Sequence, residues 1–224
     1  MGSALAELLV RGGVTELVLI DNDHFQAGNL ARHILGMDSV SRSKAQAVAE
    51  RLKNTTPHAS VCAIEEAFPP KDPDACDELA KCDLVFDCTA SDDVLAHIGT
   101  FHWGQPTNFA SVSIGYEARR LFVFTAQGES FPSADCSDEM RPWLERERDR
   151  MPHEDLPWEG TGCWNAVFPA RADDIWLLTA IALKHVTTAW AQGACMSQLA
   201  VYEQCGGDGI SAGVRRVDAD STTP

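Results

Sequence analysis

Residues 17–23, Leu-Val-Leu-Ile-Asp-Asn-Asp, form an apolar run that ends in an acid. This pattern is typical of a buried parallel strand whose carboxyl end faces a nucleotide. At that point a carboxylate can accept hydrogen bonds from both hydroxyls of a ribose. Asp21 is therefore the first candidate for a binding residue, and the competing interpretation is a turn former at the end of a strand. For Asp23 we expect the turn former.

Asn29, Arg32 and Lys44 follow this strand in short order. Asn29 and Arg32 are three residues apart, so they share a face if the segment is helical. An arginine can form paired hydrogen bonds to phosphate oxygens, and a lysine supplies a point charge. Taken singly, each cation is also compatible with ordinary surface charge. Together they suit a triphosphate better than a nicotinamide, so a nicotinamide-dependent oxidoreductase explains Asp21 and leaves the other residues without a role.

The start of the chain is unusual for such a site. A helix is expected over residues 4–10, where a first strand and a full glycine-rich loop ought to come earlier. Gly2 is a candidate for the last residue of a phosphate loop, because Asp21 lies about twenty residues further on, where a ribose-binding acid belongs. We therefore expect the first strand and the start of the loop to be absent. Either Met1 is an internal methionine of a longer reading frame, or the protein is truncated at this point, and the sequence leaves both open.

Strands and helices alternate along most of the chain, which predicts an α/β fold of the Rossmann-like, doubly wound type with a mostly parallel sheet. The polar sequence of residues 127–162 predicts a crossing loop, and the glycine-rich sequence of residues 206–224 predicts a disordered tail. Strands are expected at residues 14–20, 59–64, 84–88, 108–113, 120–125 and 200–203, and further helices at 43–53, 75–80, 94–101 and 172–191.

Composition narrows the function. The 224 residues are most simply one domain, and a net charge of −15 argues against nucleic acid as the main partner. No window approaches the roughly 20 apolar residues of a membrane span, and no signal peptide is present, so we expect a cytoplasmic protein without a membrane partner. None of the eight cysteines forms a pair with the two-residue gap of a zinc or redox motif, so no zinc is expected.

Residues 19–23, residues 29–33 and Lys44 together resemble the ThiF/MoeB/E1-like adenylating family. Residues 82–89 resemble the strand before the family's magnesium-binding loop, and residues 108–111 and 121–124 resemble its later strands. The resemblance covers residues 1–205 as one adenylation domain. It implies ATP-dependent adenylation of the C-terminal glycine carboxylate of a ubiquitin-like protein, with ATP and Mg²⁺. Asp21 would then hold the ribose, and Asn29, Arg32 and Lys44 the phosphates.

One position departs from the family pattern. Family members usually carry an aspartate for magnesium directly after the Cys-Thr step, and this chain has Ala90 there. Asp92 and Asp93 are candidates to replace it, because a hard cation needs a carboxylate nearby. The alternative is that both acids cap the helix that follows. The metal ligands are therefore left open.

Cys163 is the candidate nucleophile. It precedes an apolar helix, where backbone amides and the helix dipole can favour a thiolate. The segment from Gly162 to Pro169 also looks like bacterial E1-like proteins found beside E2-like and JAB peptidase domains. By this resemblance Cys163 would carry the ubiquitin-like protein as a thioester. The competing interpretations are a structural cysteine packed by Trp164, or Cys136 as nucleophile, which we expect to be exposed in the crossing loop between acids.

The resemblance also implies partners: a ubiquitin-like protein, an E2-like protein and a second copy of the chain in a homodimer. The alternative function is a non-catalytic E1-like partner subunit or fragment that binds a ubiquitin-like or E2-like protein. Ala90 and the incomplete phosphate loop favour this alternative. Arg32, Lys44 and Cys163 favour the enzyme.

Overall fold

The computed structural model describes residues 1–150, 170–193, 197–207 and 210–218. The helices are α1 (Gly2–Arg11), α2 (Lys44–Lys53), α3 (Pro73–Leu79), α4 (Asp92–Thr100), α5 (Ser133–Arg150) and α6 (Ala172–Ala191). The strands are β1 (Glu16–Ile20), β2 (Ser60–Ile64), β3 (Leu84–Asp87), β4 (Thr107–Ile114), β5 (Arg120–Gly128), β6 (Gln198–Gly207) and β7 (Ile210–Val217). Short 3₁₀ helices η1 (Ala27–Asn29), η2 (Met37–Ser39) and η3 (Tyr116–Ala118) occupy three of the connections.

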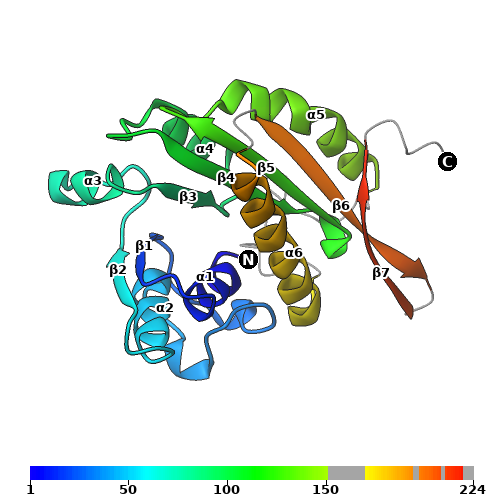
Figure 1. Ribbon diagram of the computed structural model, residues 1–224. Coiled ribbons are helices and arrows are strands. Elements are labelled where there is room, and N and C mark those ends of the chain that lie inside the picture. The colour runs from blue at the N-terminus through cyan, green and yellow to red at the C-terminus, as the bar shows by residue number, and fades with distance from the viewer. Residues whose placement is uncertain (151–169, 194–196, 208–209, 219–224) are drawn as a thin grey trace.

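The described strands form two separate sheets (Figure 1). In the smaller one, β1 pairs in parallel with β2. In the larger one, the order is β3-β4-β5-β6-β7; β3 and β4 are parallel, and the later pairs are antiparallel. The prediction of an α/β fold is confirmed, but the prediction of a mostly parallel sheet is wrong, because the main sheet is mixed. The link between β4 and β5 is too short for the crossover that a parallel pair needs.

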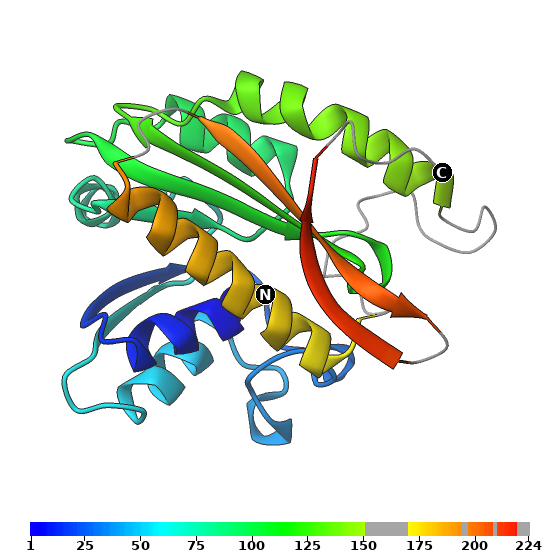
Figure 2. The same ribbon diagram turned by 45° about the vertical axis from the view of Figure 1, so that its right-hand side comes forward.

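Helix α6 fills the space between the two sheets (Figure 2). Its residues Ile175, Leu178, Ala182 and Val186 are almost completely buried, and this spacing of three or four residues places them on one face. They belong to one apolar cluster with Ala4 of α1 and with the inner residues of β4 and β5. The predicted helix over residues 172–191 is confirmed with its bounds unchanged.

Helix α5 covers the other face of the larger sheet, where the sequence predicts part of a crossing loop (Figure 1). That prediction is wrong for residues 133–150. Cys136, Met140, Trp143 and Glu147 recur at helical spacing and lie against the sheet or its edge. Many of the charged residues between them are good helix formers, and a helix on the surface needs only one apolar face. Residues 151–162 of the predicted loop lie outside the described residues.

A hairpin of β6 and β7 forms the end of the larger sheet, so the prediction of disorder is wrong for residues 206–207 and 210–217. Val217 is buried against Phe122 and Trp143. Arg215 lies opposite Glu203 and pairs with it at 3.3 Å. The sequence of β7 is polar and contains glycine, so it does not indicate a strand by itself. The strand is stabilised by its contacts with β6. No helix in the described ranges is long and apolar enough to cross a membrane.

Glu7 joins α1 to α2 and carries a testable prediction. It is 3% exposed, and its carboxylate accepts hydrogen bonds from Arg11 at 2.8 Å and Arg51 at 2.9 Å. Burial raises the pKa of Glu7, but the bonds and charges of Arg51 and Arg11 outweigh burial, and the net pKa is lowered. We expect Glu7→Gln to lower the free energy of unfolding by about 1–3 kcal/mol at neutral pH.

The pH dependence of that loss follows from the direction in which the Glu7 pKa is shifted. A carboxyl with a lowered folded-state pKa stabilises above its unfolded pKa and loses this contribution as pH falls through the folded value. The gap between the native protein and Glu7→Gln in urea unfolding should therefore shrink as pH is lowered below about 4. Glu16→Gln, at an exposed site on β1, is the matched control. A gap that does not depend on pH would contradict this account.

Candidate functional site

Asp21 and Asp23 follow β1 directly and form a tight turn. The Asp21 backbone N–H donates to Ile64 O at 3.2 Å, which extends the pairing of β1 with β2 by one bond. The Asp21 Oδ1 atom then accepts a hydrogen bond from the Asp23 backbone N–H at 2.8 Å. Burial raises the pKa of Asp21 above its ordinary value, against the opposing effects of this bond and of Lys44. The turn fixes the Asp21 carboxylate at the carboxyl end of the strand.

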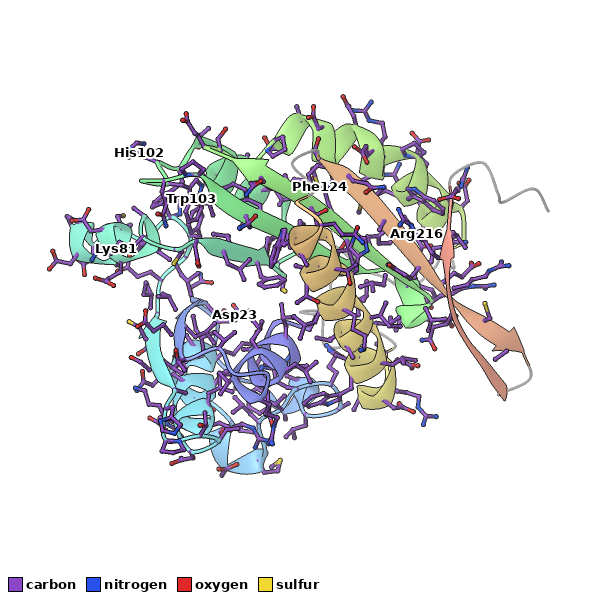
Figure 3. All side chains as sticks on the ribbon, in the orientation of Figure 1. Asp23, Lys81, His102, Trp103, Phe124 and Arg216 are labelled. Atoms are coloured by element: carbon purple, nitrogen blue, oxygen red, sulfur yellow. The ribbon has the colours of Figure 1, made fainter. Side chains whose placement is uncertain are left out.

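Lys44 is the first residue of α2 and pairs with Asp23. Its Nζ lies 2.7 Å from Asp23 Oδ2, and its side chain is only 12% exposed. The Lys44 backbone N–H also donates to Asp23 O at 2.9 Å. Ser43 caps α2 by accepting from Gln46 N, so the helix starts where the sequence predicts. Asp23 thus does more than form a turn, and Figure 3 shows it beside the blue helices of the smaller sheet.

Asn29 and Arg32 are both buried, at 6% and 8% exposure. The Asn29 Oδ1 atom accepts from the Gln26 backbone N–H at 3.0 Å, and the Arg32 backbone N–H donates to Asn29 O at 3.1 Å. Asn29 therefore holds the loop that carries Arg32. A buried guanidinium is costly unless an anion or polar groups accept its hydrogen bonds. The predicted phosphate contacts of both residues stay predictions.

His33 was not proposed as a site residue, yet several cations of this region act on it. Burial, together with the positive charges of the amino terminus, Lys44 and Arg51, lowers the pKa of His33 to about 3. The imidazole is therefore neutral, and its Nδ1 accepts from Leu35 N at 3.2 Å. In the sequence, only its place at the end of the Asn-Leu-Ala-Arg-His motif pointed to His33 as part of the site. In a chain with a net charge of −15, such a cationic region suits an anion.

Gly2 lies at the start of α1, beside the end of β3. A Cβ atom on Gly2 would lie 3.4 Å from the Cβ atom of Cys88, which follows β3 directly. The backbone N–H groups that open α1 are therefore close to the β3–α4 loop. Helix openings of this kind favour anions, because their N–H groups lack partners within the helix. The structure brings Gly2 near Cys88, and the role of Gly2 in phosphate binding stays a prediction.

The β3–α4 loop contains Ala90, whose φ of 53° lies in the left-handed region. Asp92 and Asp93 follow in the first turn of α4, and both are exposed. The side chain of Ser91 caps this helix by accepting from Val94 N. Neither acid is thus the capping residue. No cluster of three or more metal-ligating side chains occurs in the part of the chain that the structure describes.

A cavity of about 430 Å³ lies between α5 and the face of β4 and β5. Ala90, Asp92 and Ser111 line the end that adjoins the β3–α4 loop. Phe124 and Arg148 line other parts of it. The cavity therefore adjoins the carboxyl ends of β3 and β4, and helix α5 covers it.

The two candidate nucleophiles have different outcomes. Cys136 is 2% exposed in α5, so the prediction that it is exposed is wrong. Burial, followed by the charges of Asp87, Glu139 and Asp92, raises the pKa of Cys136 to about 12. A thiol of this kind is inert at neutral pH. Cys163 lies outside the described residues, and its role stays a prediction.

The model of the ThiF family matches residues 1–143, which is more than half of the chain. The chain belongs to the ThiF family. The E1-like resemblance inferred from the sequence is thereby confirmed. The departure at Ala90 is therefore a feature of a genuine family member.

This ThiF-family chain is similar in sequence to two curated relatives and in fold to one solved structure. It is 39% identical over 186 residues to the "ATP-dependent ubiquitin transferase-like protein Cap2" of Enterobacter hormaechei, which covers 83% of this chain and 30% of Cap2. It is 32% identical over 90 residues to the "Sulfur carrier protein ThiS adenylyltransferase" of Escherichia coli, covering 40% of this chain and 35% of that protein. The chain thus spans less than a third of the length of Cap2. Escherichia coli MccB with ATP shares the fold, with a TM-score of 0.59 at 12% identity, over 97% of this chain and 60% of MccB.

Proposed function

We propose that this chain forms part of an enzyme that uses ATP to adenylate the C-terminal carboxylate of a ubiquitin-like protein and then carries that protein as a thioester on Cys163. The observation that carries the proposal is the group of cations near the end of β1: Lys44 pairs with Asp23 and acts on Asp21, and together with the amino terminus and Arg51 it acts on the buried His33. The similarity to Cap2 and to the ThiS adenylyltransferase supports the same chemistry.

The residues fit an ATP molecule. One oxygen of Asp21 is held by Asp23, and the carboxylate can accept from the ribose hydroxyls through the other. Lys44 exchanges Asp23 for a phosphate, which is feasible because the Asp23 side chain is 55% exposed. Arg32 offers a planar fork that can bind two phosphate oxygens. Magnesium would supply further positive charge, with the exposed carboxylates of Asp92 and Asp93 as its candidate ligands.

The first step is an in-line displacement at the α-phosphorus. An oxygen of the substrate carboxylate forms the new bond to this phosphorus, the bond to the bridging oxygen breaks, and pyrophosphate leaves. Lys44 and Arg32 neutralise the charge that accumulates on the phosphates, and positioning accounts for much of the remaining rate. In the second step the Cys163 thiolate attacks the acyl carbon, a thioester forms, and AMP leaves.

The experiment that tests this function is ATP–pyrophosphate exchange by the full-length protein, measured with ubiquitin-like proteins that end in glycine. We expect Cys163→Ala to retain exchange and to lose the conjugate that thiols can release, because only the second step uses the thiol. Cys62→Ala, at an exposed free cysteine, is the matched control and should retain both.

Two outcomes would contradict the proposal in different ways. A thiol-sensitive conjugate that survives Cys163→Ala excludes Cys163 as the carrier. An absence of exchange, together with stable binding of a ubiquitin-like or E2-like protein, favours the non-catalytic partner subunit. The observation that favours this second function is Ala90, which lacks the carboxylate that the family resemblance implies for magnesium.

A further inference from the structure

Asp87, the last residue of β3, is a buried carboxylate without an ion pair among the described residues. It is 5% exposed, and burial raises its pKa. Its Oδ1 atom accepts from Thr89 N at 3.0 Å and from Thr89 Oγ1 at 2.6 Å. Its Oδ2 atom accepts from Ser111 Oγ on β4 at 2.9 Å. A carboxylate retained at such a site is held by hydrogen bonds alone, and burial would be cheaper for an apolar residue.

These hydrogen bonds continue into α4. The Thr89 hydroxyl oxygen accepts from Ser91 N at 3.2 Å, and the Ser91 hydroxyl accepts from Val94 N in the first turn of the helix. Ala90 lies between them in the left-handed region, which is strained for a residue with a Cβ atom. Such a conformation persists only where the surroundings determine it. The connected bonds from Ser111 through Asp87, Thr89 and Ser91 supply that determination.

The loop held in this way lies between two parts of the site. Cys88, next to Asp87, contacts the start of α1 near Gly2. Ala90 and Asp92 line the 430 Å³ cavity under α5, together with Ser111. A shift of this loop would therefore change the distance between the opening of α1 and the cavity.

We propose that Asp87 is a positioning residue for the adenylation step: it fixes the β3–α4 loop so that the opening of α1 and the cavity keep their relative placement. This inference rests on the proposed function. Asp87 itself lies beneath the loop surface and acts through Thr89 and Ser111. The hydrogen bonds, and not the negative charge, are what the loop requires.

The test compares Asp87→Ala, Asp87→Asn and Thr89→Val in ATP–pyrophosphate exchange. We expect Asp87→Ala to lower kcat about 100-fold, which a misplacement of about 1 Å can cause, with the KM for ATP within about threefold. Asp87→Asn keeps an oxygen for Thr89 and an amide for Ser111, whose hydroxyl can also accept, so it should restore kcat to within about fivefold. Thr89→Val should lie between them. Asp83→Asn, at an exposed site just before β3, is the matched control.

Hydrogen–deuterium exchange of the peptide that covers residues 84–95 gives a readout that does not depend on activity. We expect faster exchange at residues 89–94 in Asp87→Ala and protection close to native in Asp87→Asn. Unchanged protection in Asp87→Ala, or a kcat within twofold of native, would overturn the inference. If Asp87→Ala fails to fold, Thr89→Val and Asp87→Asn still decide. If the native protein shows no exchange of pyrophosphate, the proposed function is wrong, and hydrogen–deuterium exchange alone decides whether Asp87 fixes the loop.

Discussion

Replacing Lys44 by alanine is expected to lower ATP–pyrophosphate exchange by about 100- to 1000-fold, the loss typical when one preorganised charge partner of a transition state is removed. The Lys44 ammonium is largely buried at the start of α2, 2.7 Å from Asp23, so its position is fixed before a ligand binds. The fold should survive, because Asp23 is more than half exposed and water can solvate its carboxylate once the lysine is lost.

The controls separate charge from helix structure. Lys53→Ala, at an exposed site in the last turn of the same helix, should retain exchange within about twofold. Lys44→Arg keeps the charge on a different geometry and should fall between the native protein and Lys44→Ala. A Lys44→Ala protein with native exchange and a native melting temperature would exclude Lys44 from the nucleotide site.

Replacing Arg120 by alanine is expected to lower the free energy of unfolding by about 3–5 kcal/mol, because the buried Glu147 would lose its cation and the buried Glu203 would lose its nearest one, keeping Arg215 and Arg119. Arg120 is 1% exposed and pairs with Glu147 of α5 at 2.6 Å and with Glu203 of β6 at 2.8 Å. Its guanidinium also lies 5.6 Å from the centre of the Trp143 ring. One side chain thus joins the sheet to the helix that covers the cavity.

Urea unfolding with a matched surface variant checks this value. Arg216→Ala, at an exposed site on β7 that Figure 3 labels, should change the free energy of unfolding by less than about 0.5 kcal/mol. Burial raises the pKa of Glu203, but Arg120 and its neighbours oppose burial, and the net pKa is lowered. In Arg120→Ala this pKa should therefore rise. If Arg120→Ala lowers the free energy of unfolding by less than about 1 kcal/mol, water must reach the carboxylates of Glu147 and Glu203.

Sequence periodicity predicted most elements of the fold because their own residues determine them. The apolar spacing in α6 and the continuous apolar run of β3 are local signals, and both elements lie where they were expected. Helix α5 and strand β7 were missed because partners distant in sequence create their buried faces. The mixed sheet was missed for a related reason: the direction of β5 depends on the tight connection after β4, and composition carries no record of it.

The candidate site was predicted in the types of its residues more than in their contacts. Asp21, Lys44 and Gly2 lie near the ends of β1 and β3, as the expected topology requires. The pairing of Asp23 with Lys44 joins residues 21 positions apart, and the neutral state of His33 depends first on burial and then on charges from three separate segments. Neither can be inferred from spacing along one strand or helix.

The division of the strands into two sheets has a consequence for colloidal behaviour. Within the described residues β1 pairs only with β2, and β3 only with β4, so each presents an apolar strand with one unpaired edge. Such edges are templates for pairing between molecules. The net charge of −15 then acts as a kinetic barrier to aggregation, since like-charged molecules repel one another before their edges can meet. Concentrated salt or mild acid weakens that barrier, and we expect either to promote association of the protein.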